Sequence, residues 1–126
     1  MKEYLNGLQH IGIPTADVAG TIAFYEELGF EVVMETKLDE TEVAFLDLNG
    51  LVIETYTSPD PAMESGAINH ITIDVSDVEE CYKIAKERGY VITDGGGIND
   101  LPFWDGVRYF IIEGINKERI EFNQKL

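Results

Sequence analysis

An internal repeat constrains this chain more than any other feature of its sequence. When the 126 residues are compared with themselves at an offset of 60, His10 falls on His70, which is the only other histidine. The same offset places Asp17 on Asp77 and aligns the isoleucines around both histidines without a gap. Aligned strand, helix-start and helix-end signals indicate two copies of one supersecondary unit.

Each copy begins with a strand that leads into a helix. Apolar alternation predicts the first strands at residues 8–14 and 68–75. Asp17 is typical of a helix N-cap, and "SDVE" at 76–79 predicts a capping box in which Ser76 accepts from backbone N–H groups. Glycines at positions 29 and 89 stand where helix C-terminal caps are expected.

Three further strands complete each copy. They are expected at 30–37, 41–48 and 51–56 in the first half, and near 90–93, 106–113 and 118–123 in the second. Asn49 and Gly50 predict a two-residue hairpin turn. The expected fold class is therefore α+β, with two βαβββ modules in tandem. Residues 1–126 form a single domain in this interpretation, with module one at about 7–56, a linker at about 57–67 and module two at about 68–126.

Composition limits the partners of the chain. The sequence has 24 Asp and Glu against 9 Lys and Arg, a net charge of −15, which argues against nucleic acid or an anionic membrane as a partner. No window reaches the roughly 18 to 20 apolar residues of a membrane span. One cysteine, Cys81, cannot form an intrachain disulfide, so a reducing cytoplasm is the expected location.

Strand alternation predicts where the histidines and two glutamates point. Ile11 and Ile13 share the face packed against the helix, so His10 points to the opposite face. His70 is placed in the same way by the second copy. The last strand of each copy carries a glutamate on this open face, Glu54 in "LVIETY" and Glu121 in "RIEFN".

Two imidazoles and two carboxylates on matched strands are a ligand set for a divalent transition metal, with positions left for water or substrate. One histidine on a strand, taken alone, is more often a hydrogen-bonded structural residue than a metal ligand. One glutamate on a strand is more often an exposed surface or edge residue. The repeat-matched pairing of His10, Glu54, His70 and Glu121 favours the metal interpretation.

Several stretches together resemble the vicinal oxygen chelate superfamily, which includes glyoxalase I, methylmalonyl-CoA epimerase, extradiol dioxygenases and the bleomycin and fosfomycin resistance proteins. They are "HIGIPTADVAGTIAFYEELGFEVV", "LVIETY", "INHITIDVSDV" and "RIEFNQ". The resemblance implies curved sheets that form a metal-containing cleft. It implies the metal ligands His10, Glu54, His70 and Glu121, and this His/Glu/His/Glu set is that of glyoxalase I.

The resemblance further implies a lactoylglutathione lyase-like activity as a metal-dependent lyase or isomerase. Glu121, or as second choice Glu54, would take a proton from one carbon of a small carbonyl–thiol adduct and return it to the neighbouring carbon. A metal ion, nickel, zinc, cobalt or manganese, would stabilise the enediolate between the two steps. A small-molecule substrate and a homodimer are implied as partners. Pro14 and Ser58 stand where glutathione-binding relatives carry Arg and Asn, which weakens the expectation of glutathione itself.

Two other functions remain open: an acyl-CoA epimerase such as methylmalonyl-CoA epimerase, and a non-catalytic drug- or metabolite-binding protein of the bleomycin-resistance type. Phe103 and Trp104 lie in a Gly-rich loop at 94–106 and either line the mouth of the cleft or anchor the loop. Arg108 either meets an anionic substrate or forms a surface salt bridge. Cys81 is expected in the core rather than as a nucleophile.

Overall fold

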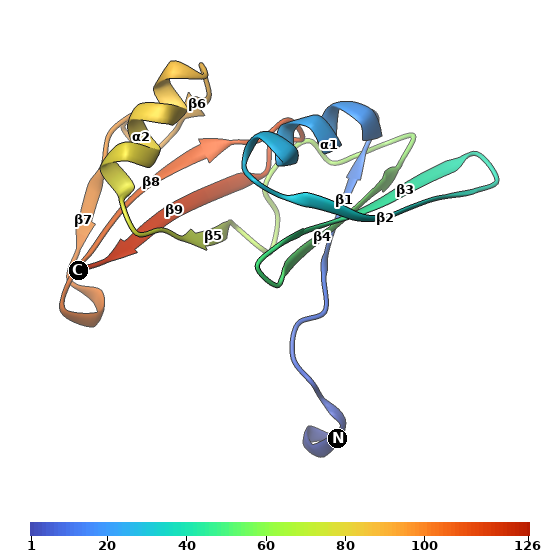
Figure 1. The fold of residues 1–126 in the computed structure, drawn as a ribbon, viewed down its shortest axis with the longest axis horizontal. Helices are drawn as coiled ribbons and strands as arrows, with labels where there is room; N and C mark the ends of the chain where they lie inside the picture. Colours follow the sequence, from blue (N-terminus) through green and yellow to red (C-terminus); the bar gives the residue numbers. More distant parts are fainter. The chain divides into compact units, whose positions relative to one another are not determined.

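The strands of the first half pair with one another in one mixed sheet of order β1-β4-β3-β2 (Figure 1). In the computed structural model, which describes residues 1–126, these strands are β1 (Ile11–Thr15), β2 (Glu31–Leu38), β3 (Thr41–Leu48) and β4 (Leu51–Thr57). β1 runs parallel to β4, whereas the β2–β3 and β3–β4 pairs are antiparallel. Asn49 and Gly50 both have positive φ, 49° and 95°, so the predicted tight hairpin turn joins β3 to β4.

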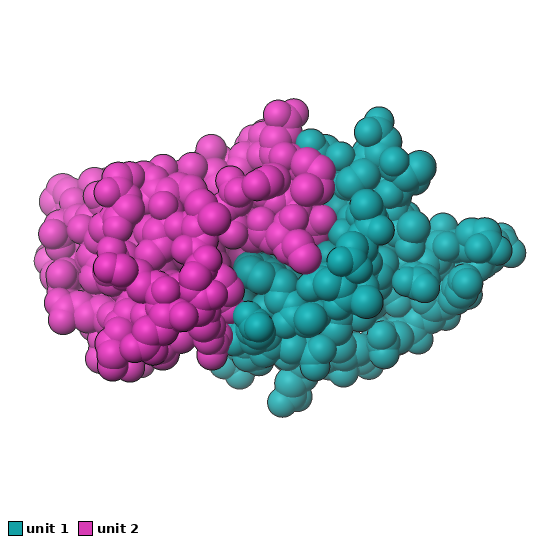
Figure 2. Space-filling model, turned by 90° about the horizontal axis from the view of Figure 1, so that it is seen from above, with its two compact units in different colours: residues 1–62 teal, residues 63–126 magenta.

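The strands of the second half form a separate sheet that repeats this plan. Its order is β5-β9-β8-β6, with β7 paired to the other part of β8. These strands are β5 (Ile71–Asp74), β6 (Val91–Ile92), β7 (Asn99–Leu101), β8 (Val107–Glu113) and β9 (Arg119–Lys125). β5 runs parallel to β9, as β1 does to β4. The chain divides accordingly into compact units at 1–62 and 63–126 (Figure 2).

Each unit carries one helix, and an aspartate caps each helix start. α1 (Val18–Glu27) begins after Asp17, whose carboxylate accepts from the Gly20 N–H at 2.9 Å. α2 (Val78–Glu87) begins after Asp77, which accepts from Glu80 N–H at 3.0 Å. The prediction that Ser76 caps the second helix is wrong, because the residue that matches Asp17 in the repeat supplies the oxygen one position later. Neither helix is long and apolar enough to cross a membrane.

Glycine ends both helices as expected. Gly29 and Gly89 have φ of 100° and 73°, the left-handed region that a side chain would make costly. The following N–H returns to the last helical turn in each copy, from Phe30 to the Tyr25 carbonyl at 3.1 Å and from Tyr90 to the Ala85 carbonyl at 3.0 Å. Both helices therefore end with the same hydrogen-bond pattern, and each is followed by the next strand of its own unit.

The last strand of each unit buries an isoleucine on the face of the sheet that the sequence pattern assigned to the core. In the first unit, Ile53 is fully buried beside the half-buried Glu54. In the second unit, Ile120 is 2% exposed and precedes the half-buried Glu121. Other core residues are Ile13, Tyr25, Phe30 and Leu46 in the first unit, and Val78, Ala85, Phe110 and Ile112 in the second.

The starts of β1 and β5 and the segment 94–106 differ from the prediction. β1 and β5 start at Ile11 and Ile71, so each histidine stands immediately before its strand rather than within it. The segment 94–106 is not a simple loop, because it contains β7 and the 3-10 turn η2 (Phe103–Asp105). A three-residue strand with the sequence Asn-Asp-Leu has no apolar alternation that would have predicted it.

Candidate metal and substrate site

The first unit brings His10 against Glu54. Nε2 of His10 lies 3.3 Å from Oε2 of Glu54, and about a third and a quarter of the two side chains are exposed. Parallel pairing of β1 with β4 sets Gly12 opposite Glu54, so the residue before the strand can reach the carboxylate. The ring of Phe45 contacts the His10 ring edge-on at 5.4 Å between centroids and supports it from β3.

The second unit repeats the arrangement with His70 and Glu121. Nε2 of His70 lies 3.6 Å from Oε2 of Glu121, and only 12% of the Glu121 side chain is exposed. Thr72 takes the place of Gly12 opposite the glutamate. Asn123 donates from Nδ2 to the other carboxylate oxygen, Oε1, at 2.8 Å, which leaves Oε2 directed to the imidazole.

A carboxamide next to each histidine was not predicted and bears on its chemistry. Nδ1 of His10 lies 3.0 Å from Oε1 of Gln9, and Nδ1 of His70 lies 2.9 Å from Oδ1 of Asn69. Because an amide oxygen can only accept, this contact selects, for a neutral ring, the tautomer with hydrogen on Nδ1, and Nε2 of that tautomer carries the lone pair. The signal was present in the sequence, since the offset of 60 aligns Gln9 with Asn69.

This geometry fits a cation in each unit. In the neutral ring, the Nε2 lone pair faces a carboxylate oxygen, and two acceptors at such distances need a shared proton or a cation between them. Imidazole nitrogen with carboxylate oxygen is a donor set for divalent transition metals. Each unit supplies two such donors, and no group of three or more His, Cys, Asp or Glu side chains is assembled.

The second unit also contains a cavity of about 890 Å³, within the range of small-molecule sites. Among the residues that line it are His70, Glu121, Asn123, Lys125, Phe103 and Trp104. The His–Glu pair and a set of apolar side chains therefore share one hollow.

Phe103 and Trp104 both line this cavity, and both are largely exposed, at 55% and 69%. Their rings meet edge-on with centroids 6.3 Å apart. The side chains therefore do not anchor the segment in the core, and they border the hollow that contains His70 and Glu121.

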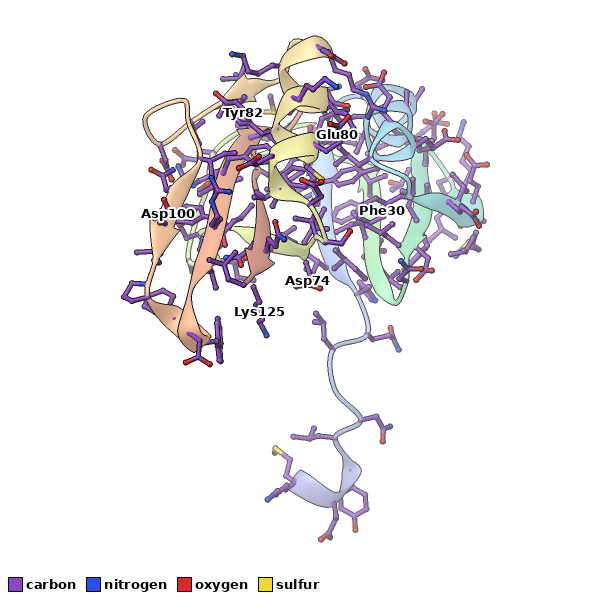
Figure 3. All side chains as sticks on the ribbon, turned by 60° about the vertical axis from the view of Figure 1, so that its left-hand side comes forward. Phe30, Asp74, Glu80, Tyr82, Asp100 and Lys125 are labelled. Carbon is purple, nitrogen blue, oxygen red and sulfur yellow. The ribbon has the colours of Figure 1, made fainter.

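Arg108 forms ion pairs outside the cavity. Its guanidinium donates to Glu79 on α2 at 2.5 Å and to Asp100 on β7 at 3.2 Å (Figure 3 labels Asp100). The hydrogen bond to Glu79 is the main reason that the pKa of Arg108 lies above its ordinary value. Arg108 is not among the residues that line the cavity, so the site described here does not include it.

Cys81 lies on α2 and is partly buried. Burial raises the pKa of its thiol, and the nearby carboxylates of Asp77 and Glu80 raise it further. A thiol that keeps its proton is a poor nucleophile. The position agrees with a packing role on the helix.

The comparisons with known proteins agree with this fold. The protein YwbC of Bacillus subtilis (strain 168), which is uncharacterized, is 33% identical over 129 residues, covering 94% of this chain and 97% of YwbC. A glyoxalase family protein from Enterococcus faecalis superposes with a TM-score of 0.79 at 23% identity, covering 95% of this chain and 98% of that one. The fosfomycin resistance protein FosX from Listeria monocytogenes superposes with a TM-score of 0.75 at 19% identity, covering 97% and 95%.

A sequence model of one family spans most of the chain. It is described as the glyoxalase/bleomycin resistance protein/dioxygenase superfamily, and it matches residues 7–112. The match runs from the segment before β1 into β8, and so includes three of the four residues of the two His–Glu pairs. The chain belongs to the glyoxalase/bleomycin resistance protein/dioxygenase superfamily.

Proposed function

We propose that this protein is a metal-dependent lyase or isomerase of the glyoxalase type, which moves a proton between neighbouring carbons of a small carbonyl–thiol adduct. The observation that carries the proposal is the repeated triplet of carboxamide, histidine and glutamate. Gln9, His10 and Glu54 in the first unit correspond to Asn69, His70 and Glu121 in the second. Superfamily members include many enzymes, and members commonly use divalent metals.

The proposed metal ligands are the four residues His10, Glu54, His70 and Glu121, one histidine and one glutamate from each unit. Nickel, zinc, cobalt and manganese all accept such nitrogen and oxygen donors. When bound, the ion would supply Lewis-acid polarisation of the substrate oxygens and so lower the cost of removing a proton from the adjacent carbon. The carboxamides of Gln9 and Asn69 would hold both imidazoles with Nε2 free to ligate.

Glu121 is the proposed base. Its carboxylate is the less exposed of the two, and Asn123 fixes Oε1 so that Oε2 is the oxygen that can accept the proton. The same oxygen then returns the proton to the neighbouring carbon. Glu54 has no corresponding amide partner, because Tyr56 stands two residues after it where the second unit has Asn123. Glu54 is therefore the second choice for this role.

The apolar side chains among the polar residues of the cavity lining, Phe103 and Trp104 included, would pack against the remainder of the substrate. Because Pro14 and Ser58 stand where glutathione-binding relatives carry Arg and Asn, the proposal extends to adducts of other small thiols. A homodimer in a reducing cytoplasm is the expected state of the protein.

The test begins with metal analysis of protein purified without an affinity tag, followed by calorimetric titration with nickel, cobalt, zinc and manganese. His10→Ala and His70→Ala should each weaken binding strongly, whereas Glu121→Gln should retain the metal better than it retains turnover. Hemithioacetals of methylglyoxal with glutathione, cysteine and 2-mercaptoethanol serve as substrates. If the wild-type protein binds none of the four metals, the proposal fails. If it binds metal and converts no hemithioacetal, the glyoxalase-type reaction is excluded.

A further inference from the structure

The open face of β9 carries two cations beside the proposed base. Alternate residues of this strand line the cavity: Arg119, Glu121, Asn123 and Lys125. The carboxylates of Asp74, Asp94 and Glu121 also line this hollow, so the two cations are positive charges within an acidic lining. An anionic group is repelled by most of this lining and attracted only to a cation that no carboxylate neutralises.

The first unit has no counterpart of these cations. The corresponding positions around Glu54, at offsets of −2, +2 and +4, hold Val52 and Tyr56 on β4 and Ser58 just after its end. Lys125 occupies the +4 position relative to Glu121 that Ser58 occupies relative to Glu54. The two copies therefore differ in charge on this face, and the cations belong to the copy that contains His70 and Glu121.

Of the two cations, Lys125 is the one with no carboxylate partner, although Nε of Arg119 is buried without a hydrogen bond. Arg119 is already neutralised, since its Nη2 donates to Asp94 at 2.6 Å. Nζ of Lys125 instead lies 4.6 Å from the centre of the Trp104 ring. A cation over an aromatic face keeps its charge and its three N–H donors for another acceptor.

Trp104 is held in a conformation that its side chain disfavours. Its backbone has φ 46° and ψ 46°, and Asp105 follows with φ 73°. A bulky residue in the left-handed region is strained, and such strain concentrates at ligand clamps. Here the strained residue is the exposed aromatic that lines the cavity and contacts Lys125.

We propose that Lys125 and Trp104 form a subsite for a carboxylate of the substrate, whose reacting oxygens lie at His70 and Glu121. The proposal rests on the proposed function. Four residues at about 3.3 Å each separate Lys125 from Glu121 by about 13 Å along β9. The substrate class is therefore an extended organic acid with adjacent oxygens at one end, an apolar middle that packs on Phe103 and Trp104, and a carboxylate at the other.

The first experiment uses the metal-free protein and reads the fluorescence of Trp104, the only tryptophan of the chain. Phenylacetate and phenylacetamide are matched probes with and without the charge. Phenylacetate should bind about tenfold more tightly, the effect of one charge-assisted hydrogen bond. Lys125→Met should abolish this preference.

Lys86→Met is the matched control. Nζ of Lys86 lies 5.5 Å from the centre of the Tyr82 ring on α2, so this variant also removes a cation from an aromatic face. Tyr82 on α2 lies well away from Lys125 at the end of β9 (Figure 3), and Lys86 does not line the cavity. Lys86→Met should keep the preference for phenylacetate. Equal binding of the two probes to wild type, or an equal loss in both lysine variants, would overturn the proposal.

A second experiment tests the length of the substrate in cobalt-loaded protein with hydroxamic acids that end in a carboxylate after four, six or eight methylene groups. The hydroxamate supplies the adjacent oxygens, and affinity should be greatest for the chain that spans about 13 Å. The gain from the carboxylate should disappear in Lys125→Met and in the methyl esters. Affinity that does not change with chain length would overturn the assigned length.

These outcomes separate the two proposals. His70→Ala should weaken cobalt binding and leave the phenylacetate preference of the metal-free protein intact. Protein that binds no metal but prefers phenylacetate through Lys125 would contradict the proposed function and retain the subsite. Protein that binds cobalt and turns over hemithioacetals without that preference would retain the function and lose the subsite.

Discussion

Nδ1 of His10 lies 3.0 Å from the side-chain oxygen of Gln9, the residue immediately before it. His70 and Asn69 repeat this relationship at 2.9 Å. The hydrogen bond selects the Nδ1–H tautomer and turns Nε2 toward the glutamate in each unit. The repeat has therefore preserved the orientation of each histidine as well as its identity.

Replacing these carboxamides should weaken metal binding without unfolding the protein. Gln9→Ala and Asn69→Ala should each lower cobalt affinity about 10- to 100-fold, because the imidazole loses the acceptor that orients it. Gln9→Glu and Asn69→Asp keep an acceptor and should retain affinity. Competition titration against a chelating dye measures the effect, and the thermal midpoint of the metal-free protein is the control. Unchanged affinity in both alanine variants would contradict the orienting role.

The N-cap of α2 provides a test on stability. Asp77→Ala should lower the free energy of unfolding by about 1 kcal/mol, because the Glu80 N–H loses its acceptor. Ser76→Ala should cost less than about half of that, since Asp77 remains in place. Urea denaturation of the two variants gives both values. A larger loss for Ser76→Ala would show that the serine contributes to the cap.

Cys81 should react slowly with thiol reagents. Burial, reinforced by Asp77 and Glu80, raises the pKa of its thiol, so less thiolate is present at pH 8 than in a free cysteine. Because folding raises this pKa, the protonated thiol favours the folded state. This contribution to the free energy of unfolding is complete at pH values below the pKa of the unfolded thiol, and it is lost as the pH rises through the pKa of the folded thiol. Reaction with a disulfide reagent, in buffer and in urea, should be faster in urea at pH 8. Equal rates would show an ordinary thiol.

Arg108→Met should leave ligand binding unchanged. The guanidinium is bound to Glu79 and Asp100 and lies outside the lining of the cavity. Cobalt affinity and the preference of the protein for phenylacetate should both equal those of wild type in this variant. A loss of that preference would place Arg108 among the substrate contacts.

Most of the fold was predictable because the repeat and the strand periodicity are local signals. Ile11 and Ile71 follow their histidines in identical patterns, and the alternating residues around Glu54 and Glu121 identified the buried face. The same comparison should have chosen Asp77 over Ser76 as the helix cap, since Asp77 aligns with Asp17. The pattern "SDVE" also matches a capping box that starts at Ser76, and the local propensities of serine and aspartate for the N-cap position are too similar to distinguish Ser76 from Asp77.

The cavity wall was not predictable in the same way. The position of Trp104 depends on β7 pairing with β8 and on a backbone conformation that a tryptophan disfavours. Neither has a periodic signature in the sequence. The contact between Trp104 and Lys125 joins residues 21 positions apart through this irregular segment. Only the three-dimensional structure therefore relates them.

The separation of the strands into two sheets also has a consequence for synthesis on the ribosome. Every partner of β1 lies within the first sheet, and every partner of β5 lies within the second. Once the first 62 residues have emerged, the N-terminal sheet can close without waiting for the rest of the chain, because it needs no later strand. The time during which unpaired strands can aggregate is thereby divided into two shorter periods. The first ends when β1 pairs with β4, and the second ends when β5 pairs with β9.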